Sequence, residues 1–348
     1  MCSSDLFGQA FADAWFKLIH RDLGPKSRYL GKDYVQKDFL FQDPISAVDY
    51  TLVDAADIKS LKKEIMASSL SVSDRIKTAW ASAVSFRGSD DRGGANGARI
   101  CLEPQKSWEA NEPQLLARNI AMLRNIQKKF NQAQTQGPKP KKISMADLIV
   151  LAGNTGVEEA ALKAGSRIEV PFLPGRNDAS QEQTEVKSFD FLKVTADGFR
   201  NYYNKDQSYL NPSLAFADKA DLLNLTPQEM TVLTGGMRVL GANYKDSKNG
   251  VFTKTPGTLT NDFFVNLLEK STVWTESADR PGVYIGRDRS SNAQKWTATS
   301  QDLIFGTNAS LRLISYSYGT VNAKRKFVTD FAGAWNKVMN LDQFEVNR

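Results

Sequence analysis

The sequence predicts a mainly α fold with few short strands. Apolar residues recur at spacings of three and four along most of the chain, which is the pattern of helices that bury one face. Helix start signals agree, because the segments 144–147 and 226–229 each place an N-cap hydroxyl three residues before a carboxylate. The best candidates for strands, 99–102 and 167–172, are both short.

The first predicted helix ends at His20, ahead of the stop signal Gly24-Pro25. We expect one of its faces to be buried, because its apolar residues share that face: Phe7, Phe11, Ala14, Trp15 and Leu18. A stretch that contains glycine, proline and lysine follows and ends at 42–44, which indicates a linker.

Helical patterns then recur along the rest of the chain. They lie at 58–66, 76–86, 116–130, 148–161, 191–202, 227–240, 263–270, 311–318 and 327–339. The segment 137–142 carries prolines and lysines, so it is predicted to be a charged surface loop between two helices.

Two segments near opposite ends of the chain repeat each other. Residues 11–17 (FADAWFK) and 331–337 (FAGAWNK) are identical at five of seven positions. Both segments are predicted to be helical, and each comes just before an expected domain end. We therefore predict a duplicated domain of which the first copy contributes only its final helix, with two unrelated amphipathic helices as the alternative.

Composition excludes several classes of protein. The 348 residues include 41% hydrophobic and 24% charged side chains, as in an ordinary globular protein. No run reaches the roughly 18 apolar residues of a membrane span. The net charge of +6 is spread over separate clusters, so we expect neither a nucleic acid nor a membrane as a partner. Cys2 and Cys101 are too few for a disulfide framework, and a bridge between them is left open.

The chain contains a single histidine, His20. A Ser-His-Asp site, a histidine-rich zinc site or a haem peroxidase pair of imidazoles would have to use it or do without. Sites that need two histidines are therefore excluded. We interpret His20 itself as a helix C-terminal residue that interacts favourably with the helix dipole.

Several motifs follow one another in a fixed order, and the Gly-Gly-Met-Arg sequence at 235–238 is the most informative. The others lie at 16–26, 42–44, 80–99, 151–153, 170–176 and 335–342. Together these motifs resemble the catalase-peroxidases, of the class I haem peroxidase superfamily, over essentially the whole chain. The resemblance implies a haem-peroxidase-like helical fold in a degenerate copy.

The resemblance implies vestigial positions on the distal side of the haem. Active domains of this family present Arg-x-x-Trp-His there, and the guanidinium and imidazole act on peroxide. Lys77, Trp80 and Ala81 stand at those positions, so the base is missing and an ammonium replaces the guanidinium. Asn111 matches the asparagine that orients the imidazole, and it has no imidazole to orient.

The proximal side shows a similar loss. Met237 stands where the family has its haem-ligating histidine, and a thioether has no N–H to donate to a carboxylate. By the same resemblance, Asp302 matches the proximal carboxylate and Phe252 the proximal tryptophan. We expect no cofactor and no metal in this chain, with haem b only in the full-length protein.

The resemblance also implies a domain organisation and a role. Residues 1–24 would be the final helix of a preceding haem domain, 25–48 an interdomain linker, and 49–348 a C-terminal peroxidase-like domain without haem. We expect this domain not to be an enzyme by itself, but to support the haem domain that removes hydrogen peroxide, within a homodimer. A cytoplasmic location is favoured over an exported one.

Two alternatives are left open. One is a self-sufficient haem peroxidase whose iron has an unusual ligand, such as His20, Cys101 or a tyrosine. The other is a module that binds a small molecule in the emptied haem cavity, although cores tend to refill when a cofactor site decays.

Overall fold

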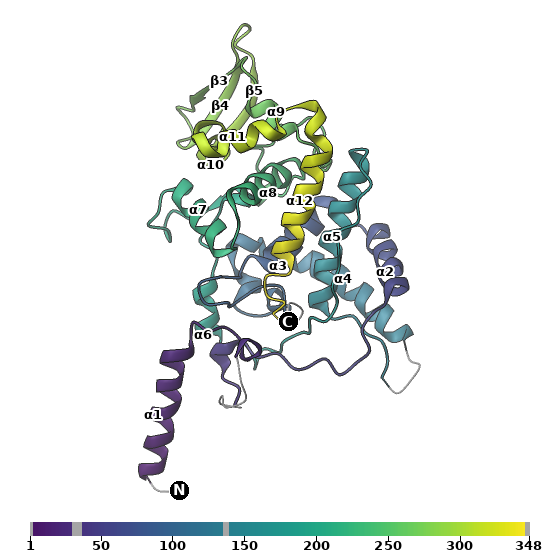
Figure 1. Ribbon diagram of the computed structural model, residues 1–348, viewed down its shortest axis with the longest axis vertical. Coiled ribbons are helices and arrows are strands. Elements are labelled where there is room, and N and C mark those ends of the chain that lie inside the picture. The colour runs from purple at the N-terminus through teal and green to yellow at the C-terminus, as the bar shows by residue number, and fades with distance from the viewer. Residues whose placement is uncertain (1–2, 30–36, 135–138, 345–348) are drawn as a thin grey trace.

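The computed structural model describes residues 3–29, 37–134 and 139–344. The mainly α prediction is confirmed, because helices dominate the described chain and its strands are short (Figure 1). The helices are α1 (Ser3–His20), α2 (Ala55–Ala67), α3 (Val72–Ala83), α4 (Pro113–Ala133), α5 (Met145–Lys163), α6 (Val186–Phe189), α7 (Pro212–Leu222), α8 (Pro227–Val239), α9 (Asp262–Leu267), α10 (Ser300–Thr307), α11 (Ala309–Tyr318) and α12 (Lys324–Met339).

Helices α3 and α5 pack closely in the core. Gly153 of α5 makes this approach possible, since a Cβ at that position would lie 2.4 Å from the Cβ of Ala79 on α3. Helix α12 runs alongside both of them and α8 (Figure 1). Its Trp335 is fully buried and donates an Nε1 hydrogen bond of 2.9 Å to Asn154.

The predicted N-caps are present. The Thr226 hydroxyl accepts from the backbone N–H of Glu229 at 3.2 Å, and the Glu229 carboxylate accepts from the backbone N–H of Thr226 at 2.8 Å. Ser144 caps α5 in the same way through the N–H of Asp147. The Asp147 carboxylate, however, binds the buried guanidinium of Arg176 at 3.1 Å, so it ties α5 to the following loop.

A three-stranded antiparallel sheet was not predicted. It is formed by β3 (Thr272–Glu276), β4 (Val283–Asp288) and β5 (Gln294–Thr299), in that order. Trp274 and Trp296 anchor it to the core, with ring centroids 5.4 and 6.0 Å from that of Phe252. Two further strands, β1 (Ala196–Asp197) and β2 (Tyr202–Tyr203), pair with each other.

Three predicted elements are wrong. Residues 99–102 contain a 3-10 turn, Arg99–Cys101, because Arg99 turns inward to bind backbone carbonyls, and 167–172 contain no strand. The segment 191–202 is not a helix, because the β1–β2 hairpin interrupts it with a turn that places Asn201 at a φ of 53°. Helices α6, α7 and α10 were also not predicted.

The expected burial of the first helix is wrong as well. α1 forms, but Phe7 is 73% exposed and Trp15 is 55% exposed. Figure 1 shows α1 projecting away from the other helices. Its C-terminal turn is held by Phe16, whose ring stacks on Phe39 at 5.0 Å. The spacing therefore predicted the apolar face correctly, while none of the described elements covers that face.

Some predictions fall outside the described residues. Cys2 and residues 137–138 of the charged loop are among these, and so are residues 30–36 of the expected linker. Cys101 is a free thiol within the described chain. Among the described helices, none combines the length and the apolar character needed to cross a bilayer.

Candidate functional site

Helix α3 carries three of the residues singled out on the distal side. Trp80 is fully buried, and its Nε1 donates a 3.0 Å hydrogen bond to the Asp197 carboxylate. Ala81 is buried beside it. Lys77 lies one turn earlier, and its ammonium pairs with Asp246 at 2.7 Å. The structure therefore satisfies both polar groups, on Lys77 and on Trp80, with carboxylates of the same chain.

Asn111 reaches the distal helix only through an intermediary. Its Nδ2 donates to the carbonyl oxygen of Gln105 at 2.9 Å. The Gln105 side chain in turn donates to the carbonyl oxygen of Ala81 at 3.2 Å. Asn111 therefore positions Gln105, which binds the backbone at the place where the family has its imidazole.

Met237 is fully buried on α8. The two glycines before it are required for packing, because a Cβ at Gly235 would lie 2.5 Å from the Phe264 ring and one at Gly236 would lie 2.1 Å from the Phe331 ring. In this chain, the glycine pair of the motif thus allows aromatic rings from α9 and α12 to lie directly on the α8 backbone.

Asp302 binds the residue that follows Met237. The Arg238 Nε donates to the Asp302 Oδ1 at 2.6 Å, and neither side chain has exposed surface. Asp302 also accepts from the backbone N–H of Thr299 at 2.7 Å, as part of the N-terminal cap of α10. Sequence reasoning singled out Asp302 but missed Arg238, although Arg238 is part of the same motif as Met237.

The 3-10 turn Gly198–Arg200 lies between α3 and α8. The Phe199 ring packs on that of Trp80, with 5.0 Å between centroids. On the other side, Arg238 donates to the carbonyl oxygens of Phe199 at 2.6 Å and Gly198 at 2.7 Å. Chain atoms therefore fill the space between the helix of Trp80 and the helix of Met237.

Three more buried charged residues lie in or beside this turn, and sequence reasoning missed all of them: Asp197, Arg200 and Lys219. Asp197 accepts from Arg200 Nε at 2.6 Å. Lys219 of α7 donates to the carbonyl oxygen of Val84 at the end of α3, and burial lowers the pKa of Lys219 to about 8. Charged residues usually indicate surface positions, so the pattern gave no signal that these three are buried.

Phe252 lies in an aromatic cluster rather than beside a polar group. It is fully buried and stacks on Phe263 at 5.1 Å between centroids. The tryptophans of β3 and β5 flank it. The structure thus brings Trp80, Met237 and Phe252 into one hydrophobic core. Asp302 and Lys77 are buried as well, and Lys77 pairs with both Asp246 and Glu112.

The unusual haem ligands considered above lie in unsuitable surroundings. His20 is on α1, where its ring stacks on Phe16 at 3.9 Å. Burial raises the pKa of Cys101 to about 11, so a metal would have to displace a firmly held proton before it could bind this thiol. Tyr202 packs on Tyr244 at 4.8 Å, and burial raises its pKa as well.

Comparison with known proteins gives a family match. The family model described as Peroxidase matches residues 9–320. The chain is 57% identical to "Catalase-peroxidase 1" of Burkholderia cenocepacia (strain HI2424) over 341 residues, which is 98% of this chain and 46% of that protein. It is also 57% identical to "Catalase-peroxidase" of Methylacidiphilum infernorum (isolate V4), again over 98% of this chain and 46% of the relative. The chain thus spans about half the length of the curated relatives it matches.

These findings correct two expectations. The expectation that the chain is not an enzyme by itself is wrong, because the peroxidase model covers most of it and the relatives bear the name of an enzyme. The expectation that it carries no cofactor is wrong for the same reason, since haem is the group that this family implies for the chain.

The residues around Met237, however, do not fit a porphyrin ligated at that position. Met237 offers a thioether and Ala81 a methyl group, and the turn Gly198–Arg200 fills the space between their helices. No catalytic step through haem follows from this position.

Three observations agree on the family. The motifs occur in the family order, the described chain has the mainly α fold that the resemblance implied, and the peroxidase model matches 9–320. The chain therefore belongs to the peroxidase family and, within it, to the catalase-peroxidases.

Proposed function

We propose that this chain forms the C-terminal part of a catalase-peroxidase, an enzyme that removes hydrogen peroxide, and that it supports the haem domain of that enzyme and contributes to its homodimer. In this proposal residues 1–24 are the final helix of the haem domain, 25–48 the linker and 49–348 the supporting domain. The names of the relatives and their greater length support it.

The exposed face of α1 is the observation that carries the proposal. Phe11 and Trp15 are more than half exposed, whereas Phe331 and Trp335, at the matching positions of α12, are fully buried. Phe331 lies directly over Gly236 of α8. Phe11 and Trp15 have the same spacing on α1, but no described helix offers them a surface like that of α8. Their exposure therefore favours a partner domain of the same fold.

A second candidate is peroxidase activity carried by this chain itself. The observation that favours it is the match of the peroxidase model across residues 9–320. It requires a haem site other than the space around Met237, since the turn Gly198–Arg200 occupies that space.

One experiment separates the two candidates. The purified chain is titrated with haemin and, separately, mixed with the haem domain of a related catalase-peroxidase that lacks its own final helix, and peroxide consumption is followed in each case. The supporting role predicts that the chain raises the activity of the haem domain, in a complex of two copies of each by analytical ultracentrifugation. The second candidate predicts a stoichiometric Soret band and peroxide consumption by the chain alone.

A further inference from the structure

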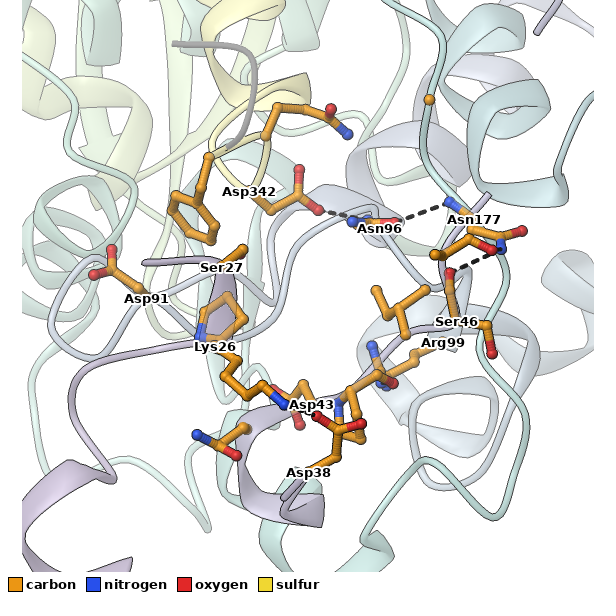
Figure 2. Close-up of a pocket in the computed structure, with 18 of the residues that line it drawn as sticks. Lys26, Ser27, Asp38, Asp43, Ser46, Asp91, Asn96, Arg99, Asn177 and Asp342 are labelled. Carbon is orange, nitrogen blue, oxygen red and sulfur yellow. Dashed lines mark hydrogen bonds and ion pairs between the residues drawn. The ribbon is translucent and has the colours of Figure 1, made fainter. Parts of the chain in front are cut away.

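A cavity of about 480 Å³ lies between residues 25–27 and 38–48, the loop after α3 and the end of the chain after α12. Figure 2 shows polar side chains from all three parts around it, including Ser27, Asn96, Arg99 and Asp342. None of the site residues predicted from the sequence lines this cavity, and it is separate from the core around Met237.

The carboxylates around the cavity are already compensated. Three of them pair with cations at 2.6 to 3.1 Å: Asp38 with Lys26, Asp43 with Arg92, and Asp91 with Arg28. The fourth, Asp342, accepts from the backbone N–H of Asn96 in the glycine-rich loop, and burial raises its pKa. The cavity wall therefore carries little uncompensated negative charge.

Arg99 is the cation of the wall that forms no salt bridge among the described residues, although Asp43 and Asp342 lie near enough to act on its charge. Its side chain is buried, with 4% of the residue exposed. Its Nε donates to the Thr184 hydroxyl at 3.2 Å, and its Nη2 donates to the carbonyl oxygens of Pro44 at 2.9 Å and Gln183 at 3.4 Å. All three acceptors are neutral, and Nη1 has no acceptor among the described residues. Burial lowers the pKa of Arg99, as expected for a guanidinium whose charge is poorly compensated.

Two amide groups add further unpaired donors. The Asn96 Oδ1 accepts from the backbone N–H groups of Gly97 at 3.0 Å and Asn177 at 3.1 Å, which fixes the amide so that Nδ2 is left without an acceptor. The Nε2 of Gln343 is buried and has no partner in the described chain. The loop after α3 thus brings two unpaired donor groups, on Asn96 and Arg99, to one cavity, which favours an acceptor-rich ligand.

The remaining wall is apolar. Pro25, Pro44, Ile45, Val48 and Phe344 line it. We propose that this cavity binds a small organic carboxylate, whose oxygens accept from Arg99 Nη1 and whose apolar body packs on Ile45, Val48 and Phe344. The site is independent of the proposed supporting role and does not involve haem.

The first test uses the whole chain in a buffer free of carboxylates, with three probes of similar shape titrated by calorimetry. Benzoate supplies the anion, benzamide a neutral polar head and benzylamine a cation. Because a hydrogen bond to a charged group contributes about 1.5–3 kcal/mol, benzoate should bind at least about tenfold more tightly than benzamide. Equal binding of the three probes, tighter binding of benzylamine, or no binding of benzoate would overturn the proposal.

Variants then locate the site. Arg99→Gln should weaken benzoate binding by about tenfold or more, whereas Arg325→Gln, which removes the same charge from an exposed position of α12, should leave it unchanged. If Arg99→Gln does not fold, Ala47→Trp is the second variant, because Ala47 is exposed on the cavity rim and a large ring there should block entry. Unchanged binding in a folded Arg99→Gln or Ala47→Trp protein would contradict the assignment.

Discussion

Arg238 and Asp302 form a fully buried ion pair, with 2.6 Å between Nε and Oδ1. The same guanidinium binds two carbonyl oxygens of the turn Gly198–Arg200. One side chain of α8 thus holds both the carboxylate that the family resemblance singled out and the turn that packs on Trp80. The contact of α8 with this turn, and through the turn with Trp80 on α3, therefore depends on the ion pair.

Asp302→Asn should therefore be strongly destabilising. The substitution leaves the Arg238 charge buried without an anion, and breaking a buried pair in this way costs about 3–5 kcal/mol. Urea denaturation measures the loss. Glu64→Gln is the matched control, because its pair with Lys129 is exposed and should contribute less than about 1 kcal/mol. A loss in Asp302→Asn no larger than in this control would contradict the account.

The glycine pair before Met237 gives a second prediction. Gly236→Ala places a Cβ 2.1 Å from the Phe331 ring, so it should cost about 1–3 kcal/mol through overpacking. Gly333→Ala, on an exposed position of α12 with no atom within 4 Å, should instead stabilise the helix by about 0.5–1 kcal/mol. Thermal unfolding of the two variants should shift in opposite directions; a shift in the same direction would show that the clash is relieved.

Lys219 makes stability depend on pH. Its pKa is about 8 in the folded chain and 10.5 as the ordinary value. Between these values the unfolded chain binds a proton that the folded chain does not, so this residue makes stability rise with pH over that window and lowers it most below pH 8. The difference in unfolding free energy between Lys219→Met and the wild type should therefore shrink by roughly 2–4 kcal/mol from pH 8 to 10.5.

Lys63→Met serves as the control for this measurement, because Lys63 is exposed on α2. Its difference from the wild type should stay constant over the same pH range. A constant difference for Lys219→Met as well would mean that the ammonium remains charged in the folded chain.

The sequence predicted the helices with capping signals well, and the reason is local. The Thr226–Glu229 capping box and the apolar spacing of α8 lie within one short segment, so no distant contact is needed to recognise them. The sheet β3–β5 was missed because its strands are mostly half exposed, and Trp274 and Trp296 become core residues only by packing on the distant Phe252.

Long-range relationships explain the other failures. The spacing in α1 is that of a buried face, yet burial depends on a partner that spacing does not contain. Arg200, Lys219 and Arg238 were missed because a charged residue is buried only where the fold supplies its acceptors, and each of the three has an acceptor that is distant in sequence.

The supporting role is tested most directly by the catalase activity of a related haem domain that lacks its own final helix, at increasing concentrations of this chain. We predict that activity rises and saturates at one chain per haem domain. Trp15→Glu should abolish the rise without changing the stability of the chain, because Trp15 is exposed, while Gln9→Ala on the opposite face of α1 should not. A haem domain whose activity is unaffected by the wild-type chain, or an equal rise with Trp15→Glu, would contradict the account.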